Sequence, residues 1–319
     1  MGTVLVTGGA GFLGKHVAHS LVEAGQDVLI SYRRSFRRPE ILSDESGSRV
    51  KAVRCDVMDL PELSRIIRDN HVNSIVHLAN MSNYEGTIYQ TMQTNIQGTI
   101  NILEAAALGC VKKVTYASSS SIAMSHGGER PSMEVEGESI PIVSGSTNVI
   151  SPSKKIGEIL TLFYGATFGI SVAIIRPGLI YGPYNETEIG SPGVLRVILE
   201  ALFAGRPADL PKASRNDLVR MTYVRDVAAA ISLVHLAPSN KHIVYCLDLA
   251  KPTTWGEVED LLKELVPGCS LRFGRSEAAA APPPPHKELN LVAEFGFQPK
   301  YGIREGLCET VEWFQKGQR

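Results

Sequence analysis

Short apolar runs rich in β-branched residues alternate along the chain with longer stretches whose apolar residues recur at helical spacing. The run TVLVTG at 3–8 precedes a stretch at 12–25 with apolar side chains three and four positions apart, ending at a glycine. Helices are also predicted from the N-cap candidate Asp59 and through about 88–108 and 152–168. The further predicted strands are 27–32, 49–56, 74–80, 112–120 and 170–177. This rhythm predicts an α/β fold with a doubly wound parallel sheet.

Beyond about residue 178 the alternation weakens and loops lengthen. Helices are predicted near 193–204, 226–236, 254–265 and 303–316, and the alanine–proline run at 278–285 has the composition of a surface connector. We therefore predict a first domain at 1–178, to which segments around 215–250 return. A second lobe is formed mainly by 179–319. It is expected to lie over the carboxyl edge of the sheet, where doubly wound folds bind ligands.

Composition narrows the classes of function. The formal net charge is -1, and 20% of the residues are charged, so no basic domain suited to nucleic acid is present. The five cysteines are scattered without a CxxC spacing, which argues against a disulfide framework and a metal site. The chain shows no signal-peptide pattern and no apolar run long enough to span a bilayer. We expect a protein of the reducing cytoplasm with no nucleic-acid or membrane partner.

The loop after the first strand reads TGGAGFLG and places Gly8, Gly11 and Gly14 at a GxxGxxG spacing. The first glycine permits a tight turn, the second lets backbone N–H groups approach a pyrophosphate, and the third packs the helix against the strand. Because this loop joins a strand to a helix inside a βαβ unit, it predicts a dinucleotide site. Phe12 and Leu13, which open the helix, belong to that site.

The end of the second strand bears on the choice of dinucleotide. An acid at this point would bind the adenosine ribose of NAD, but the chain has Tyr32 followed by Arg33 and Arg34. A guanidinium matches a 2′-phosphate in forked geometry, so NADP(H) is favoured over NAD(H). Arg37 and Arg38 extend this local cluster. Asp56, at the end of the third strand, is placed to meet the adenine edge, with Val57 beside it.

Seven motifs occur in one order: TGGAGFLG, CDVMD, VHLAN, TNIQGTINILEAA, YASSSS, SPSKK and RPGLIYGP. In this order the chain resembles the extended short-chain dehydrogenases/reductases, also called the NAD-dependent epimerase/dehydratase family. The resemblance implies a Rossmann fold with a smaller C-terminal substrate-binding lobe. Members include nucleotide-sugar epimerases and dehydratases, hydroxysteroid dehydrogenases and ketone reductases. The predicted cofactor-binding residues are Gly8, Gly11, Phe12, Leu13, Arg33, Arg34, Asp56, Val57, Leu78, Ala79, Asn95, Lys154 and Pro177.

The family pattern implies a serine or threonine after strand five and a Tyr-x-x-x-Lys on the next helix. The tyrosine exchanges a proton with the substrate oxygen while hydride moves to or from the nicotinamide, and the lysine binds the nicotinamide ribose and lowers the tyrosine pKa. The serine corresponds best to Ser119, with Ser118 and Ser120 as register alternatives, and the lysine to Lys154. Ile150 stands where the tyrosine belongs.

Three accounts of this replacement remain open. Another group could supply the proton, with Tyr84, Tyr89, Tyr181, His126 or a water held by Ser119 as candidates. The scaffold could carry a non-redox isomerase, lyase or cyclase reaction, or it could bind NADP(H) without catalysis. We take Ser119, Lys154, Ser120 and Tyr181 as the predicted catalytic residues.

The substrate side also departs from the pattern of nucleotide-sugar enzymes. Leu179 stands where those members carry an asparagine, and Val219 where they carry an arginine that clamps a diphosphate, with Arg220 one residue later. A small, apolar carbonyl or alcohol substrate therefore fits better than a nucleotide sugar. We predict an atypical NADP(H)-dependent oxidoreductase and keep a homodimer and the nucleotide-sugar alternative open.

Overall fold

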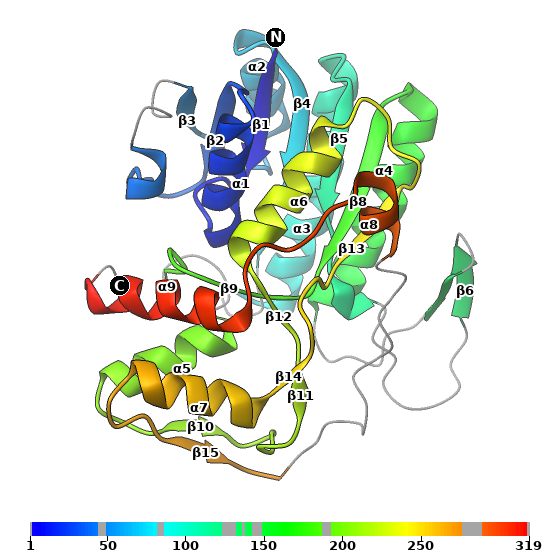
Figure 1. The fold of residues 1–319 in the computed structure, drawn as a ribbon. Helices are drawn as coiled ribbons and strands as arrows, with labels where there is room; N and C mark the ends of the chain where they lie inside the picture. Colours follow the sequence, from blue (N-terminus) through cyan, green and yellow to red (C-terminus); the bar gives the residue numbers. More distant parts are fainter. Residues whose placement is uncertain are drawn as a thin grey trace.

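A seven-stranded parallel sheet forms the centre of the molecule (Figure 1). The computed structural model describes residues 2–43, 49–81, 86–122, 132–135, 138–141, 149–186, 193–275 and 289–317. In spatial order the sheet contains β13 (Val244–Leu247), β8 (Ser171–Pro177), β5 (Lys113–Ala117), β4 (Val72–His77), β1 (Thr3–Thr7), β2 (Val28–Tyr32) and β3 (Val50–Arg54). All six pairings are parallel, which confirms the predicted doubly wound α/β class.

Helices cover both faces of this sheet (Figure 1). On one face α1 (Phe12–Glu23) packs against α6 (Val224–Leu236), and the short η1 (Glu40–Leu42) lies beside α1. On the other face α3 (Ile88–Leu108) packs between α2 (Leu60–Asp69) and α4 (Ile150–Phe168). The inner strands β1, β2 and β5 are buried on both sides, which explains their apolar sequences, whereas the edge strand β3 is partly exposed. Of the helices described, none combines the length and the apolar character needed to cross a bilayer.

The second lobe has an apolar core of its own, formed around three helices. These are α5 (Val194–Phe203), α7 (Trp255–Leu265) and α9 (Ile303–Gln315). Two-residue and three-residue strands pair around them: β9 (Leu179–Tyr181) with β12 (Met221–Tyr223), β10 (Ala208–Leu210) with β15 (Leu271–Phe273), and β11 (Leu218–Val219) with β14 (Thr253–Thr254). The chain returns to the sheet through α6 and β13; the boundary at residue 178 stays a prediction.

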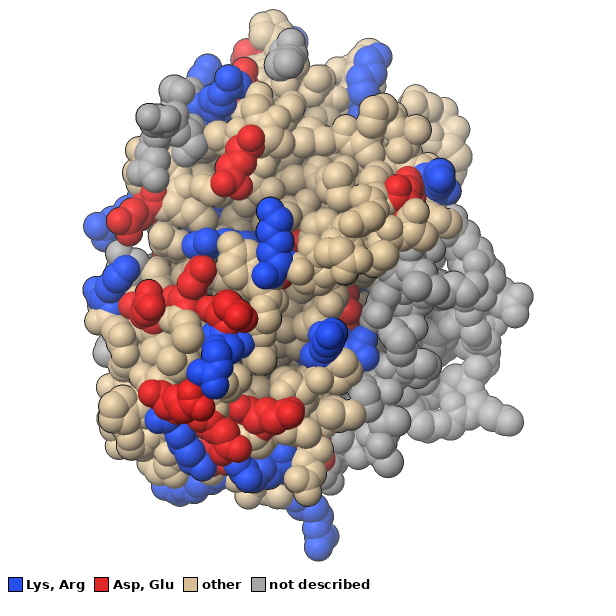
Figure 2. Space-filling view, viewed as in Figure 1, with Lys and Arg blue, Asp and Glu red and all other residues tan. Residues whose placement is uncertain are grey.

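Four further elements complete the described chain. The strands β6 (Ser132–Val135) and β7 (Glu138–Pro141) form an antiparallel pair, η3 (Ser120–Ile122) follows β5, and α8 (Leu289–Phe295) lies near β13. The predicted connector at 278–285 lies outside the described residues. On the face shown in Figure 2, acidic and basic side chains are interspersed, most densely over the second lobe. That distribution differs from the one-sided basic surface of a nucleic-acid-binding protein.

Helix ends follow local chemistry. The predicted N-cap of α2 is confirmed, because the Asp59 carboxylate accepts the Glu62 N–H at 2.9 Å. The helix predicted through about 152–168 begins two residues earlier, at Ile150, with Ser151 and Pro152 in its first turn. Proline is tolerated in the first turn of a helix, since its missing N–H would have no partner there. Ile150 and Lys154 therefore lie one turn apart on the same helix.

Candidate functional site

The glycine loop forms a tight turn at the start of α1. Gly8 has a φ of 66°, a left-handed conformation that favours glycine, and its carbonyl accepts the Gly11 N–H at 2.9 Å. A Cβ on Gly14 would overlap the Gly8 carbonyl oxygen, so the helix can approach the strand only with glycine there. Gly11 caps α1 without a side-chain hydrogen bond. Loop and helix end together make a cradle suited to a pyrophosphate.

The end of β4 lies directly against this loop. Leu78 donates its N–H to the Thr7 carbonyl, and Ala79 donates its N–H to the Thr7 hydroxyl, both at 3.2 Å. A Cβ on Gly8 would come within 2.9 Å of the Ala79 nitrogen. The structure thus brings together Gly8, Leu78 and Ala79, three of the predicted cofactor-binding residues, at the carboxyl edge of neighbouring strands.

Asp56 and Val57 follow β3 at the same edge of the sheet. The Asp56 carboxylate accepts the Met58 N–H at 3.0 Å, which orients it within the loop. The Val57 carbonyl accepts the amide of Asn101 at 3.0 Å, so α3 holds this segment in place. These contacts position both residues beside the end of β2, where an adenosine would lie in a Rossmann fold.

The arginine cluster divides into two parts. Arg33 and Arg34 follow β2 directly, the first half-buried and the second exposed. Arg38 instead donates to the carbonyls of Leu42 and Val50, at 3.1 and 2.9 Å. Arg38 therefore ties the loop to η1 and β3, and Arg33 and Arg34 are the pair at the predicted ribose position.

Lys154 is held by a carbonyl and an aromatic ring. It is 7% exposed, its ammonium donates to the Ala117 carbonyl at 2.6 Å, and its nitrogen lies 5.2 Å from the centroid of the Tyr116 ring. Burial lowers the pKa of Lys154 to about 8, while the negative charge of Glu158 acts in the opposite direction. Ile150, one turn earlier, is the residue that the family pattern predicts to be a tyrosine.

Ser119 begins a chain of hydroxyl groups. Its oxygen lies 2.9 Å from the Ser121 hydroxyl and accepts the Ser121 N–H at 3.2 Å. The Ser121 hydroxyl lies 2.9 Å from that of Ser151 on α4. Ser120, the register alternative, begins η3 and is half-buried. Sequence reasoning did not single out Ser121, although the four consecutive serines after β5 were a visible signal.

The candidate replacements for the missing phenol differ in position. Tyr84 and His126 lie outside the described residues. Tyr89, in the first turn of α3, is 72% exposed. Tyr181 is 3% exposed, burial raises its pKa, and its hydroxyl donates to the Ile303 carbonyl at 3.4 Å. That contact ties Tyr181 to the core of the second lobe, and its catalytic role stays a prediction.

Asn95 positions the segment after β4. Its amide accepts the Met81 N–H at 2.7 Å and donates to the Met81 carbonyl at 3.1 Å and to the Ser153 hydroxyl at 3.3 Å. The side chain thus joins this segment to α4, and a direct cofactor contact for it stays a prediction. Pro177 ends β8 at the same edge and is half-buried.

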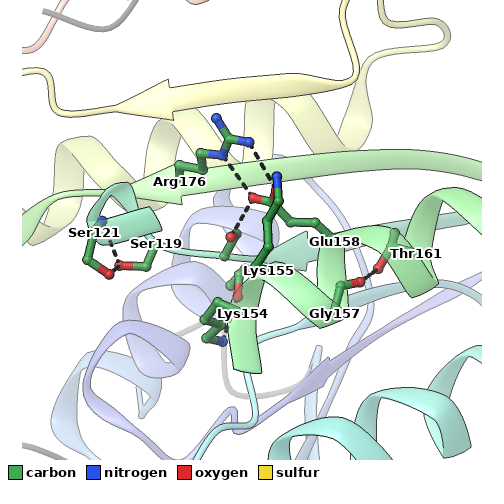
Figure 3. A network of polar contacts seen from close by, with 10 residues as sticks. Ser119, Ser121, Lys154, Lys155, Gly157, Glu158, Thr161 and Arg176 are labelled. Carbon is green, nitrogen blue, oxygen red and sulfur yellow. Dashed lines mark hydrogen bonds and ion pairs between the residues drawn. The ribbon is translucent and has the colours of Figure 1, made fainter. Parts of the chain in front are cut away.

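A buried ionic network lies behind Ser119 and Lys154 (Figure 3). Ser118 donates to the Glu158 carboxylate at 2.6 Å, and Arg176 donates to its two oxygens at 2.8 and 2.9 Å. The Lys155 ammonium lies 3.8 Å from the same carboxylate. Sequence reasoning did not single out Glu158; its spacing of four residues from Lys154, on one helix face, was the available signal.

The substrate side presents apolar residues and one ion pair. Leu179, at the start of β9, is 51% exposed, whereas Val219 is buried. The Arg220 guanidinium lies 3.8 Å from the carboxylate of Asp248, just beyond β13. Among these residues, Arg220 is the cation near the position predicted for the family's diphosphate clamp. Its guanidinium faces a carboxylate.

The sequence and fold were compared with those of known proteins. The family model of the NAD dependent epimerase/dehydratase family matches residues 4–246. The UDP-glucose 4-epimerase of Mycolicibacterium smegmatis is 26% identical over 330 residues, covering 98% of this chain and 98% of that protein. The dTDP-glucose 4,6-dehydratase of Salmonella typhimurium is 28% identical over 350 residues, covering 98% and 92%.

Solved structures show the same similarity. The UDP-glucose 4-epimerase of Thermus thermophilus, solved in complex with NAD, has a TM-score of 0.77 and 25% sequence identity. The match covers 98% of this chain and 99% of that chain. Nearly the whole molecule, with its second lobe, is therefore similar to dinucleotide-binding enzymes.

Proposed function

This chain belongs to the NAD-dependent epimerase/dehydratase family, and from that premise we propose that it is an atypical NADP(H)-dependent oxidoreductase acting on a small, apolar carbonyl or alcohol. The observation that carries the proposal is the buried Lys154 ammonium beside the Ser118–Ser119 segment at the carboxyl edge of the sheet. The cofactor cradle and these two side-chain types persist although Ile150 replaces the phenol. That combination favours hydride chemistry with an altered route for the proton.

A bound dinucleotide would supply or accept the hydride. Gly8, Gly11 and the N-terminus of α1 would hold its pyrophosphate, and Lys154 would bind the nicotinamide ribose. Ser119 would donate a hydrogen bond to the reacting oxygen, stabilising the charge that develops there. Its hydroxyl is oriented for this role by Ser121, whose N–H and hydroxyl both contact it.

The cofactor preference rests on Arg33 and Arg34, which follow β2 where an NAD-binding member would carry an acid. The related structure from Thermus thermophilus contains NAD, so a nicotinamide dinucleotide is common to both readings. A 2′-phosphate would give the paired guanidinium groups a forked, charge-assisted partner.

The substrate preference rests on Leu179, Val219 and the pairing of Arg220 with Asp248, which leave few polar contacts for a diphosphate. The second candidate is a nucleotide-sugar epimerase or dehydratase. Its support is the full-length similarity to enzymes named for UDP-glucose and dTDP-glucose. An epimerase would return its hydride, whereas a reductase would consume NADPH.

Paired measurements distinguish these readings. Ketones of increasing size, UDP-glucose and dTDP-glucose would each be incubated with the protein and NADPH or NADP, following product by mass spectrometry and cofactor by absorbance. Ketone reduction with stoichiometric loss of NADPH supports the proposal. Product without net cofactor change overturns net reduction in favour of an epimerase or a non-redox reaction. If the protein binds the cofactor tightly but turns over none of these substrates, the proposed oxidoreductase function is overturned in favour of a non-catalytic role.

We also propose that the protein forms a homodimer through α3 and α4. The outer face of α4 exposes Ile159 and Phe163, Phe168 is exposed at the end of this helix, and the adjacent α3 exposes Ile88 and Leu108 at its two ends. Large apolar side chains concentrated on two neighbouring helices are typical of an interface. A second copy related by a two-fold axis would offer the same apolar surface.

A further inference from the structure

One buried carboxylate connects the two residues on which the proposed function depends. Glu158 is 3% exposed and lies on α4 one turn beyond Lys154. Its partners come from two strands: Ser118 at the end of β5, next to Ser119, and Arg176 on β8. Figure 3 shows the Arg176 side chain directed at the Glu158 carboxylate.

Stability alone is a weak reason for such a group. Burying an ion pair removes two charges from water, and apolar residues of similar volume often stabilise a fold as well or better. The geometry points elsewhere: the Ser118 hydroxyl donates to the carboxylate at 2.6 Å, and this fixes the residue that precedes Ser119. The same carboxylate is a source of negative charge for the ammonium of Lys154.

We propose that Glu158 is a positioning residue for the dinucleotide site: its carboxylate fixes the Ser118–Ser119 segment and, one helix turn beyond Lys154, adds a negative charge to the surroundings of that buried ammonium. This inference rests on the proposed function, in which Lys154 binds the nicotinamide ribose. Glu158 itself touches neither substrate nor cofactor in this scheme.

The charges around Lys154 and Glu158 determine in which direction the loss of the Glu158 charge should change the pKa of Lys154. His77 from β4 and Tyr116 from β5 face Lys154; burial lowers the pKa of His77 to about 3 and raises that of Tyr116, so both are neutral near pH 7. Arg176 and Lys155 face Glu158 directly. Glu158 is therefore the anion that opposes the effect of burial on the pKa of Lys154.

Removing that charge should lower the pKa of Lys154 further. As pH rises, the ammonium would lose its proton earlier, and the site would lose a cation that faces the ribose and the phosphates of the dinucleotide. In Glu158→Gln, which keeps the shape of the side chain, the alkaline fall in dinucleotide affinity should therefore move to lower pH.

The test is a calorimetric titration of the full chain with NADPH and with NADP across about pH 6 to 10, a range that spans the pKa of Lys154. Thr161→Val is the matched control, because Thr161 is buried on the same helix and donates only to the Gly157 carbonyl, at 2.7 Å. It should keep the wild-type pH curve. Ser118→Ala should also keep the pH limit, but it should lower turnover through Ser119.

Two variants separate the possible failures. If Lys154→Ala binds the dinucleotide as tightly as wild type, the proposed site is overturned. If Lys154→Ala weakens binding while Glu158→Gln follows the wild-type curve, only the role of Glu158 is overturned. Should Glu158→Gln fail to fold because Arg176 is left unpaired, the double variant Glu158→Gln/Arg176→Met removes both charges. The pH above which this double variant loses affinity for the dinucleotide should also be lower than in wild type. An unchanged pH contradicts the inference.

Discussion

At the scale of single residues, Ile150 stands where the sequence predicts the tyrosine of the family pattern. It lies one turn before Lys154 on α4, so Ile150→Tyr would place a phenol next to the ammonium. General acid catalysis contributes about 10²–10⁴-fold. We expect this variant to consume NADPH with simple ketones at least tenfold faster than Ile150→Phe, which adds the ring alone. NADPH consumption is followed by absorbance. Equal rates in the two variants would show that a phenol at this position does not act as a general acid.

Arg33 gives a second prediction at this scale. If its guanidinium binds a 2′-phosphate, NADPH should bind more tightly than NADH by about 1–3 kcal/mol, the range for hydrogen bonds to charged groups. Arg33→Ala should remove most of this difference in calorimetric titrations. Arg37→Ala is the control, since Arg37 is exposed in the same loop. Equal affinities of the wild-type protein for the two cofactors would defeat the NADP assignment.

The sequence predicted those site residues that belong to contiguous motifs. The glycine loop and Lys154 are local patterns, and their fold context could be inferred from the alternation of strands and helices. Glu158 and Arg176 could not be found in this way, because their meeting depends on how α4 packs against β8. Tyr116 was missed for the same reason, since its contact with Lys154 is a tertiary one.

At the scale of elements, the N-terminus of α2 offers a direct test of capping. The Asp59 carboxylate accepts the Glu62 N–H, and Asp59→Ala removes that bond. The variant should lose about 0.5–2 kcal/mol of the free energy of unfolding, measured by urea denaturation. Asp69→Ala at the other end of the helix removes a carboxylate that pairs with exposed arginines and should cost less. A larger loss in Asp69→Ala would contradict the capping argument.

The elements that the sequence did not predict are the short ones. The helices α5, α7 and α9 of the second lobe are long enough to show apolar periodicity, and the predicted ranges lie within two residues of the observed ends. The strands β9, β10, β11, β12, β14 and β15 have two or three residues each, too few to show an alternating pattern. They pair because the surrounding helices bring them together. The returning strand β13 is hard to predict for a related reason, since its order in the sheet depends on α6.

At the scale of the whole molecule, three buried histidines predict sensitivity to acid. Burial lowers the pKa values of His16, His77 and His235 to about 3 each. The folded protein keeps these rings neutral, whereas the unfolded chain binds protons to them below about pH 6.5. The free energy of unfolding should therefore fall as pH drops from about 6.5 to about 3, by up to about 1.4 kcal/mol per pH unit for each ring.

This acid effect can be assigned to one ring. His235 is buried between Thr115 and Ser74. In His235→Gln the slope of the unfolding free energy against pH should therefore fall by the contribution of about one bound proton. His71→Asn is the control, since His71 is exposed and asparagine tolerates its positive φ of 50°. Urea denaturation at several pH values provides the measurement. Identical slopes for wild type and His235→Gln would contradict the assignment.

Assembly is the last property of the whole molecule that the structure lets us predict. Phe163 is 60% exposed at the middle of the apolar face of α4, and α4 also carries Lys154 and Glu158. A second copy docked on this face would bury Phe163, so Phe163→Glu would place a charge in the interface. We expect sedimentation velocity to show two chains per particle for wild type and one for Phe163→Glu. Leu218→Glu is the control, because Leu218 is an exposed apolar residue of the second lobe. A wild-type protein that sediments as a single chain at every concentration, or a Leu218→Glu protein that dissociates equally, would refute the dimer. A dimer that dissociates only in Phe163→Glu would place the interface on the helices that build the site.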